Sequence, residues 1–184
     1  MYGWRAKIGL ITPMSENVEH AFHIYAPEGV SFASTKISYP TESMEVLTDR
    51  IRQAAAMYQD YEVDLVVFGC TSGEHVMGFE QEQTCAHEIE HVSGRPCLSV
   101  GVAVLDALKT LGAKKVAVMT PYSGAANEGE KKFLEENGFE VTAITAMDVS
   151  YVPSLEACDE YLLYRNALKF LYSFFLHKLN ILIY

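Results

Sequence analysis

The segment Asp64-Leu65-Val66-Val67-Phe68-Gly69-Cys70-Thr71-Ser72-Gly73 decides how the rest of the chain is interpreted. It begins as an apolar, β-branched run typical of a buried strand and ends in a turn of small and hydroxyl-bearing residues around one cysteine. Open α/β sheets bind ligands at the carboxyl ends of their strands. The segment therefore places the Cys70 thiol at a ligand-binding edge, as a candidate nucleophile or acid/base group in a site for a small anion.

Short apolar runs recur along the whole chain, and helical segments separate them. The predicted strands are Lys7–Ile11, Val30–Lys36, Asp64–Phe68, Pro96–Val100, Lys115–Met119, Phe139–Ile144 and Asn180–Tyr184. The predicted helices are Glu42–Asp60 with Thr41 as its N-cap, Val102–Leu111 before Gly112, and Asn127–Asn137 before Gly138. Because strands alternate with helices, we expect an α/β fold with parallel sheets flanked by helices.

The first predicted strand and the turn after it are repeated later in the chain. Lys7-Ile8-Gly9-Leu10-Ile11-Thr12-Pro13 recurs as Lys115-Val116-Ala117-Val118-Met119-Thr120-Pro121, and each copy is followed by a helix and another strand. We therefore expect two pseudosymmetric lobes, a first lobe at 1–100 that carries the Cys70 turn and a partial second lobe at 101–184. In the second lobe the counterpart of the 64–68 strand is Asn180–Tyr184, where the sequence ends. The second lobe is accordingly expected to be incomplete, without a counterpart of the Cys70 turn.

Composition excludes several classes of function. The 184 residues carry a formal charge of −10 and offer no basic stripe to neutralise phosphates, which argues against a nucleic-acid partner. The four cysteines show no CxxC spacing, so neither a zinc site nor a disulfide framework is predicted. The amino terminus lacks the features of a signal peptide. We therefore expect a protein of the reducing cytoplasm.

The carboxyl-terminal stretch is unusually apolar. Residues Leu168–Tyr184 read LKFLYSFFLHKLNILIY, which is short and polar for a membrane span of about 20 apolar residues. A helix followed by a buried strand explains it better, so no membrane partner is expected. Because its covering elements would be absent, the apolar surface predicts poor solubility or self-association into homo-oligomers.

Four segments together resemble the aspartate/glutamate racemase superfamily, and within it the branch of maleate cis-trans isomerases and arylmalonate decarboxylases. They are Gly9–Pro13, Gly69–Gly73, Thr120–Tyr122 and Phe133–Val141. The resemblance implies an enzyme of two lobes that needs no cofactor or metal and acts on a small carboxylate substrate in a site between them. Cys70 matches the first-lobe cysteine, which in maleate isomerases adds to the double bond and in racemases acts as acid or base. Because the decarboxylases keep only the second-lobe cysteine, the resemblance favours an isomerase or racemase.

The predicted substrate contacts surround this thiol. Backbone N–H groups and hydroxyls of Thr71 and Ser72, together with the phenol of Tyr122, are suited to a preformed anion pocket. Pro13 begins a loop in which relatives carry Pro-Ser-Ser-Asn-Thr, with the asparagine on a substrate carboxylate. Here Glu16 stands at the asparagine position, so Asn17 is expected to take that role. Near Val152 an apolar residue replaces a second asparagine of the relatives.

Each candidate residue also has an interpretation as a structural residue without a catalytic or binding role. A cysteine on a strand is often a small buried hydrophobe, and the remaining cysteines are expected to be structural, with Cys85 and Cys158 on helices and Cys97 in a strand. His87 and His91 stand four residues apart but lack the His-Glu-x-x-His pattern, so no metal site is predicted. The alternatives for function are an arylmalonate-type decarboxylase, a truncated non-catalytic binding module and a membrane-tethered protein.

Overall fold

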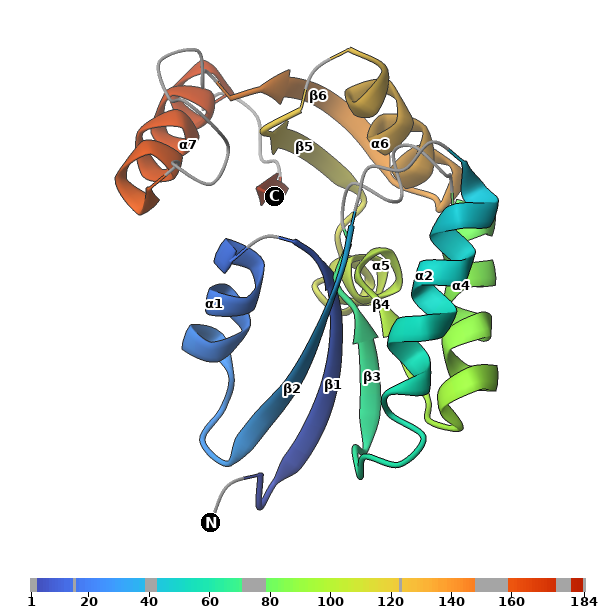
Figure 1. Cartoon of the computed structure of the whole chain (residues 1–184). Coiled ribbons are helices and arrows are strands. Elements are labelled where there is room, and N and C mark those ends of the chain that lie inside the picture. Colours follow the sequence, from blue (N-terminus) through green and yellow to red (C-terminus); the bar gives the residue numbers. More distant parts are fainter. Residues whose placement is uncertain are drawn as a thin grey trace. The chain divides into compact units, whose positions relative to one another are not determined.

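A computed structural model describes residues 3–14, 16–38, 43–70, 79–122, 124–147, 159–174 and 180–183. The chain divides into two compact units, Met1–Val104 and Leu105–Tyr184. Each unit is an α/β structure with one parallel sheet (Figure 1). The boundary between the units falls within one helix, α5 (Val100–Thr110).

The first unit contains a four-stranded sheet in the order β2-β1-β3-β4. Every neighbouring pair of strands is parallel, so helices must connect consecutive strands. The strands are β1 (Ala6–Pro13), β2 (Val30–Ile37), β3 (Leu65–Phe68) and β4 (Cys97–Ser99). The connecting helices are α1 (Glu16–Tyr25), α2 (Met44–Ala56) and α4 (Phe79–Ser93).

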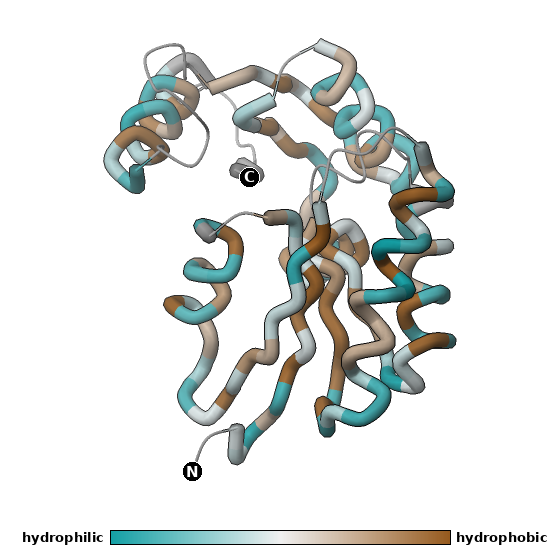
Figure 2. Tube along the Cα trace, in the orientation of Figure 1, coloured by the Kyte–Doolittle hydropathy of each residue, from teal (hydrophilic) through white to brown (hydrophobic). Residues whose placement is uncertain are grey.

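Helices α2 and α4 pack together over one face of this sheet, where they enclose the main apolar core. In Figure 2 the hydrophobic colour runs along β3 and recurs on α2 and α4 between hydrophilic turns. Tyr58, just after α2, lies on β1, where a Cβ on Gly9 would stand only 2.8 Å from its ring. The Tyr58 hydroxyl reaches the carbonyl oxygens of Leu10 (3.1 Å) and Ala33 (2.7 Å). Gly9 is therefore required by the close approach of this ring.

The second unit repeats the strand order of the first three strands. Its parallel sheet has the order β6-β5-β7, which corresponds to β2-β1-β3. The strands are β5 (Lys115–Thr120), β6 (Glu140–Ala146) and β7 (Asn180–Ile183), and the helices are α6 (Ala125–Glu136) and α7 (Glu160–Phe174). Phe170 of α7 packs with Ala117 and Met119 of β5 in a small core.

The predicted α/β class with parallel sheets is confirmed, and each predicted strand lies within two residues of an observed one. The predicted N-cap of α2 was wrong. Thr41 lies outside the described residues, and the helix is capped by Ser43, whose Oγ accepts from the N–H of Val46 at 3.3 Å. The glycines Gly112 and Gly138 do terminate helices, with φ of 68° and 91°. Within the described part of the chain, no helix is long and apolar enough to cross a membrane.

Candidate functional site

Cys70 lies two residues past the end of β3, at the carboxyl edge of the first sheet. The central strand β1 is its neighbour, with Ile11 in register with Phe68, and the N–H of Gly69 donates to the Ile11 carbonyl at 2.8 Å. By this register Pro13, the last residue of β1, is level with Cys70. The structure thus brings Pro13 and Cys70 to the same edge of the first sheet.

The Cys70 side chain points into the protein. Val66 and Phe68 face the α2/α4 layer, and strand alternation directs Cys70 to the same side. The residue is 2% exposed and belongs to the apolar core with Cys85 and Ile89 of α4. In this structure the thiol is therefore closed to bulk water, although the sequence predicts it at a ligand-binding edge.

Two further thiols lie in the same layer. Burial raises the pKa of Cys85 to about 11, with the nearby Cys70 and Glu82 as smaller causes. Burial, and next the negative charge of Glu90, raise the pKa of Cys97 to about 12. Both side chains are consequently neutral thiols at physiological pH, which fits their predicted structural roles.

A buried carboxylate joins this layer to the next helix. Glu82 on α4 is 1% exposed, and its Oε1 accepts from the backbone N–H of Gly101 at 3.0 Å. Gly101 is the second residue of α5, which follows β4 directly. A helix amino terminus presents N–H groups without partners inside the helix, and the Glu82 carboxylate accepts from one of them. Glu82 thereby ties α4 to the junction of β4 and α5.

The turn after β1 contains the predicted substrate contacts Pro13 and Asn17. Pro13 is half-buried, whereas Asn17 is exposed in the first turn of α1. Thr12 is fully buried, and its Oγ1 has no hydrogen-bond partner among the residues that the structure describes. Its methyl group lies on the Gly69 backbone, where a Cβ would stand 3.1 Å from it.

The equivalent turn of the second unit holds Tyr122 in a closed network. The Thr120 Oγ1 accepts from the N–H of Tyr122 at 3.0 Å and donates to the Asn127 Oδ1 at 2.5 Å. The Asn127 Nδ2 donates in turn to the Tyr122 carbonyl at 3.0 Å. The sequence analysis missed Asn127, which lies in the first turn of α6 and bonds back to the Thr-Pro-Tyr turn rather than capping the helix. The network fixes the backbone that presents the Tyr122 side chain.

The predicted substrate contacts Thr71 and Ser72 lie outside the described part of the chain, as do Val152 and the cysteine Cys158, which is expected to be structural. What the sequence analysis says about these four residues therefore stays a prediction. Across the described ranges, no group of three or more metal-ligating side chains is gathered. His87 instead lies 3.5 Å from the Glu90 carboxylate on the surface of α4.

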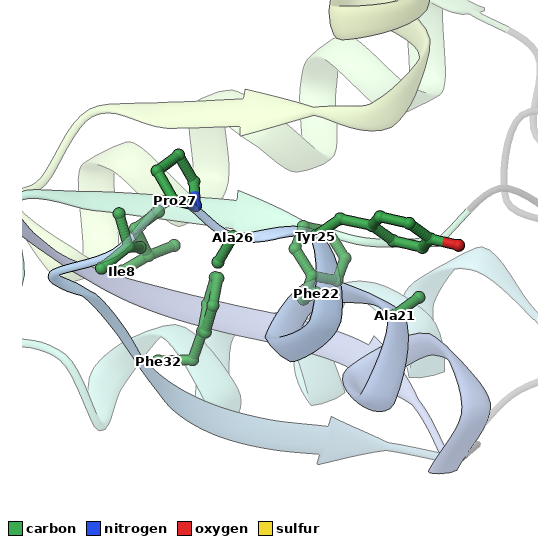
Figure 3. A pocket seen from close by; sticks show the side chains of 8 residues that line it. Ile8, Ala21, Phe22, Tyr25, Ala26, Pro27 and Phe32 are labelled. Carbon is green, nitrogen blue, oxygen red and sulfur yellow. The ribbon is translucent and has the colours of Figure 1, made fainter.

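The first unit also has an apolar pocket of about 410 Å³ between α1 and the strands β1 and β2. Figure 3 shows Phe22 and Phe32 facing it, with the Tyr25 hydroxyl directed away from the other labelled side chains. None of the predicted site residues lines this pocket. Its hydrocarbon walls offer no charge for a carboxylate, so we do not assign the candidate site to it.

The repeated strand order and the strand-end cysteine define a pseudosymmetric α/β protein of the aspartate/glutamate racemase-like superfamily. A family model for arylmalonate decarboxylase matches residues 8–172, and the chain belongs to this family. A maleate isomerase of Pseudomonas putida is 21% identical over 159 residues, which cover 78% of this chain. That match spans 64% of the relative's own length, which is less than two thirds.

Solved structures show the same fold. A crystal structure of arylmalonate decarboxylase has a TM-score of 0.82 at 20% identity and covers 96% of this chain and 76% of its own. A mutant of Nocardia farcinica maleate cis-trans isomerase with a covalently bound succinylcysteine intermediate has a TM-score of 0.73 at 22% identity. It covers 89% of this chain and 72% of its own. At these identities the likeness establishes the fold alone.

Proposed function

We propose that the protein is a cofactor-independent isomerase acting on a small carboxylate, most like maleate cis-trans isomerase, with Cys70 as its reacting thiol. The observation that carries this proposal is the place of Cys70 at the carboxyl edge of the first sheet, beside the turn after β1. Support also comes from the family match over residues 8–172 and from the related maleate isomerases, one of which holds a succinylcysteine.

The proposed chemistry requires only a thiol and anion contacts. The Cys70 thiolate adds to one carbon of the double bond, an S–C bond forms, and the electron pair moves into the carboxylate next to the other carbon. Rotation about the resulting single bond and expulsion of the thiolate give the trans diacid. Donors at the carboxylate stabilise the charge that develops there, and in other enzymes one such donor contributes about 2.7–4 kcal/mol. Asn17, Thr71, Ser72 and Tyr122 are the proposed donors, and Pro13 shapes the turn beside the thiol.

The burial of Cys70 limits which molecules can react with its thiol. A thiol that is 2% exposed reacts only with a substrate that enters its enclosed surroundings, which also exclude water from the charged intermediate. We therefore expect a small diacid such as maleate to react with Cys70, whereas bulky thiol reagents react slowly.

Turnover by the full chain tests the proposal. Maleate is incubated with the protein and fumarate is followed by proton NMR, for the unchanged chain, for Cys70→Ala and for the matched control Cys97→Ala. We expect fumarate with the unchanged chain and the control, and none with Cys70→Ala. Absence of fumarate with all three proteins would reject the isomerase.

The family match raises a second candidate, decarboxylation of an arylmalonate. Retention of Cys70 favours the isomerase, because in the resemblance the decarboxylases lack the first-lobe cysteine. Release of carbon dioxide from phenylmalonate, without fumarate formation from maleate, would establish the decarboxylase instead.

Location and assembly belong to the same proposal. The absence of CxxC spacing among the four cysteines of the sequence supports our proposal of a reducing cytoplasmic location. We further propose that the protein self-associates through its apolar carboxyl-terminal region. Light scattering that shows a monodisperse monomer would refute this assembly.

A further inference from the structure

The apolar pocket between α1 and the strands β1 and β2 takes no part in the proposed reaction. Its volume is about 410 Å³, and its described walls come from α1, from the turn after this helix and from both strands (Figure 3). Ile11 of β1 belongs to the apolar core with Cys70, whereas Ile8, three residues earlier on the same strand, lines the pocket. Because side chains alternate along a strand, the pocket lies across the sheet from the Cys70 side chain.

The pocket exists because α1 presents a small side chain to the sheet. Ala21, Phe22 and Tyr25 stand at helical spacing on the side of α1 that lines the pocket. None of the described side chains of α1 is buried, whereas α2 on the other face of the sheet buries four. The alanine at position 21 thus leaves a space that a larger side chain would fill.

Aromatic contacts hold the walls of the pocket in place. The rings of Phe22 and Phe32 meet edge to face with their centroids 5.7 Å apart, and the His23 ring meets Phe32 in the same way at 5.2 Å. Phe22 also packs against Gly69, where its Cε2 lies 3.5 Å from the position of an added Cβ. These contacts form without an occupant, as is usual for sites that bind small molecules.

Size and charge together define the occupant. An apolar cavity of about 150 Å³ in another protein binds benzene, so a pocket of about 410 Å³ accommodates one or two aromatic rings. Among the described residues that line it, none carries a charge, and Glu19 of α1 is already paired with Lys36 at 2.9 Å. A charged ligand would lose its hydration here without gaining a partner. A recess of this size encloses a whole small molecule, but only one or two side chains of a partner protein.

We propose that this pocket is a binding site for an uncharged aromatic molecule of one or two rings, separate from the site of the Cys70 reaction. The ligand lies between the apolar side of α1 and the strand residues Ile8, Val30 and Phe32. It covers apolar surface that otherwise contacts water, and this burial drives the binding. Because the pocket and the thiol are on opposite faces of the sheet, the inference holds whether or not the chain isomerises maleate.

Fluorine NMR with two probes of similar shape tests both the place and the charge. The uncharged probe is para-fluorotoluene, and its anionic counterpart is para-fluorobenzoate. Each is titrated with the unchanged chain, with Ala21→Leu and with the control Ala56→Leu, which adds the same side chain at an exposed position of α2. We expect para-fluorotoluene to bind the unchanged chain and the control equally, and Ala21→Leu about tenfold more weakly, because the leucine occupies the ligand's space. For para-fluorobenzoate we expect the same signal with all three proteins, because the anion does not enter the pocket.

A second measurement locates the probe in the unchanged chain. We expect nuclear Overhauser contacts from the ring protons of para-fluorotoluene to the methyl groups of Ile8 and Val30. Equal binding by Ala21→Leu, contacts only with other parts of the chain, or no binding at millimolar probe would overturn the inference. A para-fluorobenzoate signal that Ala21→Leu abolishes would overturn the assigned chemistry. A changed oligomeric state of Ala21→Leu in light scattering, without probe binding to the unchanged chain, would show instead that a second copy fills the pocket.

Discussion

The two Thr-Pro turns have the same local sequence but different polar surroundings. In the second unit the Thr120 hydroxyl both accepts and donates, within a ring closed by Tyr122 and Asn127. In the first unit the Thr12 hydroxyl is equally buried but has no hydrogen-bond partner in the described ranges. The second turn is therefore supported by its own hydrogen bonds, whereas the first leaves a polar atom unpaired beside the Cys70 strand. A repeated motif preserves the path of the backbone without preserving its hydrogen bonds.

The strands that lead into these turns differ in a related way. Gly9 in β1 corresponds to Ala117 in β5 in the repeated segment. The ring of Tyr58 covers Gly9, while Ala117 packs with Met119 and Phe170. The residue at this strand position thus matches the side chain that packs on it, Tyr58 in the first unit and Phe170 in the second.

The largest effect is expected from Thr120→Val. The valine is nearly isosteric, but it removes the acceptor of the partly buried Tyr122 N–H and the donor to the buried Asn127. At about 1–3 kcal/mol for a buried unpaired group and less for a partly buried one, we expect a loss of about 2–4 kcal/mol of unfolding free energy. Urea denaturation followed by circular dichroism measures it. An unchanged midpoint would mean that the network does not stabilise the turn.

The next largest losses of stability are expected when the residues at the two corresponding strand positions, Gly9 and Ala117, are exchanged. Gly9→Ala places a methyl group 2.8 Å from the Tyr58 ring, whose hydroxyl lies against the carbonyl oxygens of β1 and β2, and should cost about 1–3 kcal/mol. Ala117→Gly removes a buried methyl group and adds backbone freedom, so we expect a loss of about 1–2 kcal/mol. Thermal melts of both variants measure these losses. Equal or higher stability of Gly9→Ala would show that Tyr58 does not constrain this position.

Thr12→Val is expected to change the free energy of unfolding in the opposite direction to Thr120→Val. Here the valine replaces a buried hydroxyl that has no partner in the described ranges, so removal of its desolvation cost should stabilise the first unit by up to about 1 kcal/mol. The same urea titration compares the two variants. A destabilisation like that of Thr120→Val would reveal a partner for this hydroxyl and remove the contrast between the turns.

The sequence predicts most of the architecture because apolar strands and glycine-terminated helices are local signals. Residues 64–68 and 115–119 are recognisable as strands from their own side chains, and Gly112 and Gly138 end helices for steric reasons. The sequence analysis does not predict α1 or the start of α7, although the apolar residues of both helices recur at helical spacing, as they do in α2. The N-cap of α2 is missed because Thr41 and Ser43 are equally suitable by residue type.

The site is only partly predictable for a physical reason. The place of Cys70 at the strand end follows from local sequence, but its burial depends on α4, whose Cys85 and Ile89 cover it from a distant segment. The contact of Glu82 with Gly101 and the ring of Thr120 and Asn127 also depend on tertiary packing. Such contacts leave little trace in the residues near the motif itself.

The smallest predicted effects concern two ion pairs, one in each unit, that join neighbouring elements of secondary structure. Glu19 lies 2.9 Å from Lys36, both about 30% exposed, and the hydrogen bond from Lys36, followed by that from Ser34, lowers the pKa of Glu19. A lowered carboxyl pKa stabilises the fold above the unfolded value of about 4.3, and this stabilisation is lost as the pH falls through the folded pKa.

We therefore expect Glu19→Gln to cost less than about 1 kcal/mol near neutral pH and less again at acidic pH. Glu140→Gln is the matched control, because Lys115 and Glu140 are more than half exposed, and it should cost still less. Urea titrations at the two pH values measure both variants. A loss for Glu19→Gln that persists in acid would show that the pair acts by packing rather than charge.

The most direct test of the central claim is the mass of the Cys70 peptide after incubation of the native chain with maleate and acid quenching. We predict an added mass of one maleic acid on Cys70, absent from the neutral thiols Cys85 and Cys97 and suppressed when the chain is unfolded in urea before incubation. An unmodified Cys70, or equal modification of all three cysteines, would contradict the account of Cys70 as the reacting thiol.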